Sequence, residues 1–180
     1  TLMGVSMGGA IASNYASINK EKIEALILNV PFVGAETIGL SAFMQFPFVW
    51  DFYLRFVIIK RAITRGAEMQ DENDSGADNH FVHQFSIKGT ESAFNSLLKN
   101  FLEHNFLEDY KKLSALQIPT HVTYAIDDED VPASSILEAL ELFPQAESFS
   151  FEGGHNILNE KRDEIISLIS DFKSKKIQCN

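Results

Sequence analysis

The stretch Gly4-Val5-Ser6-Met7-Gly8-Gly9 decides how the rest of this sequence is interpreted. The apolar residues 2–5 predict the end of a strand, and the segment 8–19, which opens with small residues, predicts a helix packed closely on a sheet. A serine between a strand and a helix lies on a sharp, strained turn that exposes its hydroxyl. We therefore interpret Ser6 as a candidate nucleophile, with a glycine-rich connection as the alternative.

The residues beside Ser6 meet separate physical requirements of such a turn. Gly4 and Gly8, two positions away on either side, are small enough to let the backbone turn sharply. The backbone N–H of Met7, at the start of the helix, becomes a donor to a developing oxyanion. The helix dipole favours negative charge at the same place.

Further along the chain, short apolar runs alternate with amphipathic segments. This alternation predicts repeated strand–helix units and an α/β fold with a parallel sheet. The further predicted strands are residues 25–30, 119–126 and 148–151, and the further predicted helices are residues 134–143 and 161–173.

The middle of the chain has a different pattern. It is rich in Phe, has no good strand pattern, and shows helical periodicity at residues 43–63 and 92–104 on either side of a polar break at residues 70–79. We interpret it as an all-helical insertion between two strands. The predicted divisions are residues 1–32 and 117–180 for the sheet-containing core and residues 33–116 for the helical lid.

An acidic loop follows the predicted strand that ends near Ile126. A histidine that acts as a base needs a carboxylate to fix its tautomer, and such groups lie at the carboxyl ends of strands in open α/β sheets. Asp127, Asp128 and Asp130 all compete for this role. A solvated acidic loop without a catalytic role is the alternative.

His155 follows the paired glycines Gly153-Gly154, after the last predicted strand and before the last predicted helix. A catalytic base must project from a loop toward the serine, and the glycines let the backbone turn there. A single histidine is more often structural or on the surface. Here, however, the serine, the acid and the histidine follow one another in the chain order of the hydrolase fold.

Together the three motifs resemble those of the α/β-hydrolase superfamily of lidded esterases, lipases and peptidases, and the resemblance covers nearly all 180 residues. GVSMGG resembles the serine turn of that family, called the nucleophile elbow. GGHNILNEKRDEI resembles its histidine loop and the helix that follows. AIDDEDVP resembles its strand-end acid motif, in which the acid stands four residues before proline. That spacing selects Asp128, although Ala125 stands where the family usually has glycine.

The resemblance implies a role for each residue: Ser6 attacks an acyl carbon, His155 takes and returns the proton, and Asp128 orients His155. It implies a serine hydrolase that uses no cofactor or metal and cleaves a small-molecule carboxylic ester, with a lipid or acylglycerol as one option. Three alternatives stay open. They are an amide or peptide hydrolase, a lyase that uses the same residues for acid–base work, and a non-catalytic truncated product.

The resemblance also implies an N-terminally truncated fold, in which the chain retains only strands 5 to 8 of the family's sheet. Strand 5, at residues 2–5, would then be an exposed apolar edge to which a partner chain could pair. The second oxyanion donor, from a loop after strand 3, would be missing, at a cost of about 2.7–4 kcal/mol in transition-state stabilisation. We therefore expect this segment alone to be inactive or nearly so.

Length, charge and composition limit the remaining classes of fold and function. The 180 residues fit one domain, and the net charge of −10 argues against binding a nucleic-acid backbone. The single cysteine, Cys179, excludes an internal disulfide and weakly favours a reducing, cytoplasmic compartment, which otherwise cannot be read. The longest apolar run, residues 37–50, is shorter than the roughly 20 residues of a membrane-spanning helix.

Two weak metal signals lie in the polar break. Residues 71–76 resemble the first half of a calcium loop, but Val82 stands where that loop needs a bidentate acid. His80 and His83 could share a helix face near Asp78, but a third well-placed ligand is lacking. We therefore predict a solvated lid segment and no metal site.

Overall fold

The computed structural model describes residues 1–34, 46–68 and 83–177. The chain divides into two compact units. We call Thr1–Ile38 with His104–Asn180 the sheet unit, and Gly39–Glu103 the helical unit. Each unit is described by itself.

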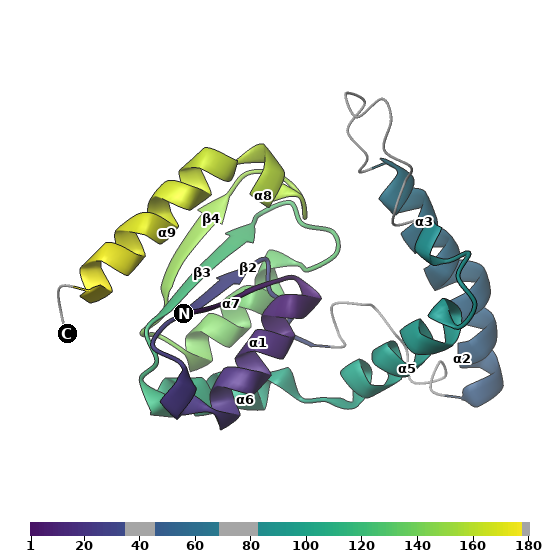
Figure 1. The fold of residues 1–180 in the computed structure, drawn as a ribbon, viewed down its shortest axis with the longest axis horizontal. Helices are drawn as coiled ribbons and strands as arrows, with labels where there is room; N and C mark the ends of the chain where they lie inside the picture. Colours follow the sequence, from purple (N-terminus) through teal and green to yellow (C-terminus); the bar gives the residue numbers. More distant parts are fainter. Residues whose placement is uncertain (35–45, 69–82, 178–180) are drawn as a thin grey trace. The chain divides into compact units, whose positions relative to one another are not determined.

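A four-stranded parallel sheet forms the centre of the sheet unit, with the order β1-β2-β3-β4 (Figure 1). The strands are β1 (Leu2–Val5), β2 (Leu26–Asn29), β3 (Thr120–Ala125) and β4 (Glu147–Phe151). They confirm the predicted α/β fold with a parallel sheet. Because all four strands run the same way, the loops after them meet at one edge of the sheet.

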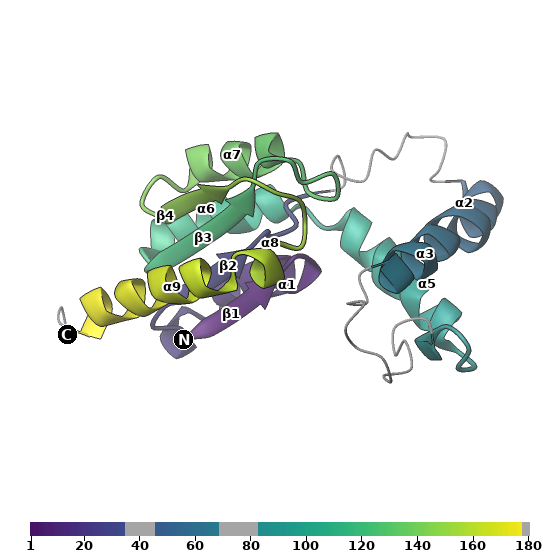
Figure 2. The ribbon, with the colours of Figure 1, turned by 90° about the horizontal axis from the view of Figure 1, so that it is seen from above.

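Helices cover both faces of this sheet, which Figure 1 shows as layers and Figure 2 shows from above. One face carries α1 (Met7–Ile18), α6 (Phe106–Leu116) and α7 (Ala133–Leu142), and the other carries α8 (Ile157–Glu160) and α9 (Arg162–Ile177). A 3₁₀ turn, η1 (Lys20–Lys22), joins α1 to β2. The parallel connections therefore pass through helices, as strand–helix units require.

The helices are held to the sheet by small and apolar side chains. On α1, Ala10 and Ala16 are fully buried, so the helix approaches the sheet closely. On the other face, Ile165 of α9 packs with Val30, Ala125 and Ile157. These residues come from the end of β2, from β3, from the short helix α8 and from α9. Helix α8 begins at Ile157, just after the predicted site histidine, His155.

Helix α6 lies in the sheet unit, whereas the sequence-based division placed residues 33–116 in the lid. The buried carboxylate of Asp109 ties α6 to α1, because it accepts hydrogen bonds from Asn14 at 3.2 Å and Ser17 at 3.3 Å. His104 also contacts Asp109, with 2.6 Å between Nε2 and Oδ2. The contacts of Asp109 with Asn14 and Ser17 join residues far apart in the chain and leave no periodicity in the sequence.

The helical unit contains α2 (Pro47–Tyr53), a π-helical turn η4 (Leu54–Ile58), α3 (Ile59–Glu68) and α5 (Thr90–Glu103). Trp50, Leu54 and Ile59 are buried in its core, and the indole N–H of Trp50 donates to Asn95 of α5 at 2.8 Å. Among the described residues, no helix combines the length and apolar content needed to span a membrane.

The residues that gave the two weak metal signals in the sequence lie mostly outside the described residues. Residues 71–76, Asp78 and His80 are not among them. His83 is described and exposed, and its Nδ1 atom lies 3.4 Å from the hydroxyl of Ser86.

Candidate active site

Ser6 lies between the end of β1 and the start of α1, in a conformation that few residues adopt. Its φ is 51° and its ψ is −123°. A non-glycine residue with positive φ is uncommon and persists only where the surrounding structure holds it. The turn therefore has the strain that the sequence motif predicts.

The glycines beside Ser6 differ in whether their surroundings leave room for a Cβ atom. A Cβ atom on Gly4 would lie 2.3 Å from the carbonyl oxygen of Gly8, so this position requires glycine. A Cβ on Gly8 would meet nothing within 4 Å among the described residues, so the expected steric need is not observed there. The second close approach is instead at Gly9, where a Cβ would lie 2.8 Å from the Cβ of Pro31.

Asp128 lies in the loop after β3, and its side chain is fully buried. Its Oδ1 atom accepts hydrogen bonds from the backbone N–H groups of Asp130 at 2.8 Å and Val131 at 2.9 Å. Its Oδ2 atom lies 2.7 Å from Nδ1 of His155. The backbone bonds fix the carboxylate so that its second oxygen faces the histidine.

The other two aspartates of the loop have different positions. Asp127 is exposed, and its carboxylate accepts a hydrogen bond from the N–H of Gly153 at 3.3 Å. Asp130 is half-buried. Of the three aspartates that the sequence leaves in competition, Asp128 is the one in hydrogen-bond contact with His155.

His155 lies between β4 and α8, after a turn at Gly153 whose φ of 124° favours glycine. Its Nε2 atom lies 2.8 Å from the hydroxyl oxygen of Ser6. An ionised carboxylate only accepts hydrogen bonds, so Nδ1 carries the hydrogen that points at Asp128. Nε2 then accepts a hydrogen bond from the Ser6 hydroxyl.

Ser6, His155 and Asp128 thus form one continuous chain of hydrogen bonds at the carboxyl edge of the parallel sheet. The side chain of His155 is 19% exposed, so it can be reached from solvent. Such a chain can remove a proton from the serine hydroxyl and return it to another group. Met7, the first residue of α1, presents a backbone N–H that has no acceptor within the helix.

The same edge contains three groups that could contact a metal ion. One ligand atom each from Asp128, Asp130 and His155 lies within 4.8 Å of the others. Nδ1 of His155 and Oδ2 of Asp128 are, however, already engaged with each other at 2.7 Å. A metal ion bound here would therefore have to displace this contact.

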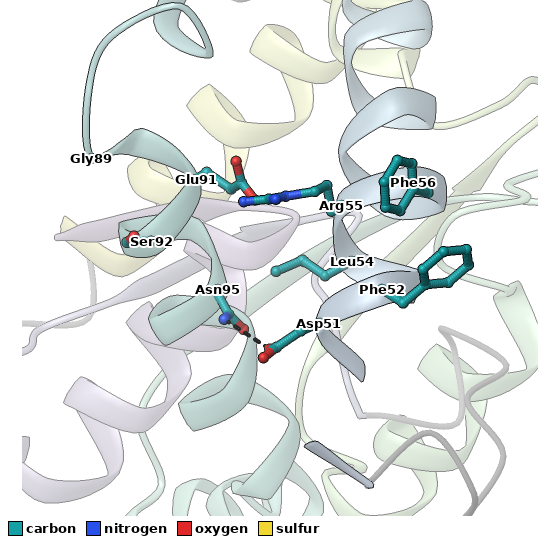
Figure 3. A pocket seen from close by; sticks show the side chains of 9 residues that line it. All are labelled: Asp51, Phe52, Leu54, Arg55, Phe56, Gly89, Glu91, Ser92 and Asn95. Atoms are coloured by element: carbon teal, nitrogen blue, oxygen red, sulfur yellow. Dashed lines mark hydrogen bonds and ion pairs between the residues drawn. The ribbon is translucent and has the colours of Figure 1, made fainter. Parts of the chain in front are cut away.

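A cavity of about 510 Å³ lies within the helical unit, between α2, η4 and α5 (Figure 3). An ion pair of 2.6 Å between Arg55 and Glu91 crosses it. Ser92 is among its lining residues, and none of the described histidines is. Its lining residues are Asp51, Phe52, Leu54, Arg55, Phe56, Gly89, Glu91, Ser92 and Asn95.

The sequence did not predict the residues in and just after β2 that form hydrogen bonds with the backbone of Ser6. The carbonyl of Asn29 accepts the N–H of Ser6 at 2.9 Å, and the N–H of Phe32 donates to the carbonyl of Ser6 at 3.0 Å. The only sequence signal here is Pro31, which marks the end of the strand. It does not indicate which neighbour the chain will contact.

Comparison with known proteins adds a family to this geometry. A sequence profile described as "alpha/beta hydrolase fold" matches residues 1–161. None of the curated proteins compared with the chain matches it.

Three solved structures illustrate the likeness in fold. An α/β hydrolase enzyme from the sediment metagenome of the Mar Chica lagoon, Morocco, is 17% identical, with a TM-score of 0.61, and covers 97% of this chain and 61% of its own. A structure from a study of carboxylesterases of Nitrososphaera gargenis is 19% identical, with a TM-score of 0.65 and coverages of 99% and 65%. The enol-lactonase of Burkholderia xenovorans LB400 is 13% identical, with a TM-score of 0.69 and coverages of 96% and 64%. The chain therefore spans less than two thirds of the length of each.

Proposed function

The chain belongs to the α/β-hydrolase fold family, and from this premise we propose that it is a serine hydrolase that cleaves carboxylic esters. One observation carries the proposal: hydrogen bonds of 2.7 Å and 2.8 Å link Asp128 to His155 and His155 to Ser6. The strained backbone of Ser6 supports the same assignment, because strain of this kind concentrates at functional sites.

The proposed reaction has two halves. Ser6 Oγ attacks the acyl carbon while its proton moves to Nε2 of His155, and the buried carboxylate of Asp128 stabilises the imidazolium. Nε2 then gives the proton to the leaving alcohol, and the ester bond breaks to leave an acyl-serine. A water attacks this acyl-serine, with His155 again taking a proton, and the acid and free Ser6 are released.

The oxyanion that forms in each half needs hydrogen-bond donors. The N–H of Met7 supplies one donor, supported by the N-terminus of α1. We propose that the second donor comes from sequence upstream of this chain, in accord with the chain spanning less than two thirds of the solved structures. Loss of one donor costs about 2.7–4 kcal/mol, so the chain alone would be a poor catalyst.

The ester class is favoured over other acyl substrates by two solved structures that share the fold. They are named as a carboxylesterase study and an enol-lactonase. An amide or peptide bond would be cleaved by the same steps, and a lyase would use His155 as the acid–base group without forming an acyl-serine.

The test uses the protein restored with its upstream sequence, which we call the restored protein. It should hydrolyse short p-nitrophenyl esters, and Ser6→Ala should abolish both this activity and labelling by a fluorophosphonate. Ser92→Ala, a matched change in the helical unit, should affect neither. If Ser6→Ala retains full hydrolysis, the proposal is wrong.

Mass spectrometry of the trapped intermediate separates the mechanisms. An acyl group on Ser6 during turnover supports the hydrolase, whereas turnover with no acylated serine would favour the lyase. Comparing an ester with its matching amide separates the two hydrolase options. A restored protein that neither turns over a substrate nor reacts with the fluorophosphonate would be a binding protein instead.

A further inference from the structure

The segment after β2 encloses the backbone of Ser6. Asn29 accepts the N–H of Ser6 at 2.9 Å, and Phe32 donates to the carbonyl of Ser6 at 3.0 Å. This neighbouring segment therefore contacts both backbone polar groups of the proposed nucleophile, and the carbonyl of Ser6 also accepts from Gly9 and Ala10 in the first turn of α1, at 2.9 Å and 3.3 Å. The side chain of Asn29 is itself fixed, because it accepts a hydrogen bond from the hydroxyl of Thr123 on β3.

The contact from Asn29 continues the parallel β1–β2 ladder, whereas the contact from Phe32 depends on the path of the chain at Val30. The φ of Val30 is 41°, in the left-handed region that β-branched residues almost never occupy. The conformation is more unusual because Pro31 follows, and a residue before proline is biased toward extended backbone. Val30 is thus a second strained residue next to Ser6.

Packing holds Val30 in this conformation. The residue is fully buried, and its side chain packs with Ala125, Ile157 and Ile165. Its N–H donates to the carbonyl of Thr123 at 2.7 Å, which anchors the turn to β3. Ile157 opens the helix that follows His155, so the same side chain touches the segment that carries the proposed base.

We infer that Val30 is a positioning residue for the nucleophile: its left-handed backbone places the N–H of Phe32, which donates to the carbonyl of Ser6 in its strained turn. The inference rests on the proposed function for its effect on catalysis, but the hydrogen bond from Phe32 to Ser6 is a property of the backbone. Val30 touches neither substrate nor the reacting atoms. It acts through the backbone of Ser6.

Two substitutions in the restored protein separate positioning from packing. Val30→Ala removes the packing but leaves a residue that disfavours the left-handed region, so the turn should relax. Val30→Gly removes slightly more side chain but adopts positive φ readily, so the turn should persist. We expect Val30→Ala to lower kcat and the rate of fluorophosphonate labelling by about tenfold, from the strain of a left-handed alanine. Val30→Gly should be clearly more active than Val30→Ala.

A role in packing alone predicts the opposite order, because glycine leaves the larger cavity. Activity of Val30→Gly equal to or below that of Val30→Ala would therefore overturn the inference. So would two variants that both keep wild-type kcat. If Val30→Ala does not fold and Val30→Gly does, the order is the one that positioning predicts.

Hydrogen exchange tests the hydrogen bond from Phe32 to Ser6 without a measurement of enzymatic activity. In the wild-type protein the amide of Phe32 should exchange slowly, because it donates to the carbonyl of Ser6. Val30→Ala should accelerate this exchange, and Val30→Gly should accelerate it less. A Phe32 amide that Val30→Ala does not accelerate would contradict the inference, whereas the expected exchange pattern with an unreactive Ser6 would contradict only the proposed function.

Discussion

At the scale of single residues, the loop after β3 presents three aspartates, of which Asp128 contacts His155. We predict that Asp128→Asn in the restored protein lowers kcat by about 10⁴, because an amide in this place favours the wrong tautomer of the histidine. Asp127→Asn and Asp130→Asn should change kcat by only a few fold. Ester hydrolysis at saturating substrate measures all three. A larger loss at Asp127 or Asp130 than at Asp128 would show that the acid is assigned wrongly.

The glycines of the serine turn give a second prediction. Gly4→Ala should destabilise the fold by about 1–3 kcal/mol or more, because overpacking against a fixed backbone forces the chain to move. The obstacle is the carbonyl oxygen of Gly8, 2.3 Å from the added methyl group. Gly8→Ala should be neutral or stabilising by up to about 1 kcal/mol, because alanine is the better helix former. Urea unfolding of the 180-residue chain compares them, and equal losses in the two variants would disprove the distinction.

The sequence predicted candidate site residues where a reactive side chain also stands just after a predicted strand. Ser6, Asp128 and His155 each stand after a predicted strand, and the structure brings them into hydrogen-bond contact. Val30 carries no such signal. The local preferences of a β-branched residue before proline point to extended backbone, and only burial between distant segments overrides them.

At the scale of secondary-structure elements, the apolar pattern located every strand of the described sheet. The buried strand β2 begins with a continuous apolar run, whereas β4 alternates polar and apolar residues. The pattern did not separate α6 from the helices of the helical unit. The place of residues 106–116 is decided by the contact of Asp109 with α1. The π-helical turn at Leu54–Ile58 has no sequence signal that we can identify.

The contact between α9 and the sheet contains a histidine that should make stability depend on pH. His121 of β3 is fully buried against Phe149 and Phe172, and neither ring nitrogen has a hydrogen-bond partner among the described residues. Burial lowers the pKa of His121 below its ordinary value of 6.5, an effect that Lys175 reinforces and Glu147 opposes. The folded protein therefore holds His121 neutral.

The sign of the pH effect follows from this shift. The unfolded chain takes up a proton near pH 6.5, whereas the folded chain resists it, so stability falls as the pH drops through that value. We predict a loss of up to about 1.4 kcal/mol per pH unit from this single proton. His121→Leu should remove that slope, and His83→Leu, at an exposed site, should not. Urea unfolding at pH 7.5, 6.5 and 5.5 measures the slopes, and an unchanged slope in His121→Leu would rule out this group as the cause.

At the scale of the whole molecule, the sheet of the described chain ends at β1, which has a paired neighbour on one side only. Large apolar side chains are exposed on β1 and on α1. Met3 is 50% exposed on the strand, and Ile11 and Ile18 of α1 are 52% and 67% exposed. In a complete α/β-hydrolase sheet further strands would cover this side, so we propose that these residues form part of a continuous core in the restored protein.

The last prediction follows from this edge. Unpaired strands and exposed apolar side chains promote association, so the 180-residue chain by itself should form dimers or larger species at micromolar concentration. Met3→Lys should shift sedimentation toward monomer, because a charged side chain on an edge strand disfavours pairing. Leu137→Lys, which places the same charge at a 47% exposed position on α7, is the matched control and should have little effect. A chain that sediments as a monomer without either substitution would show that the β1 edge is already protected.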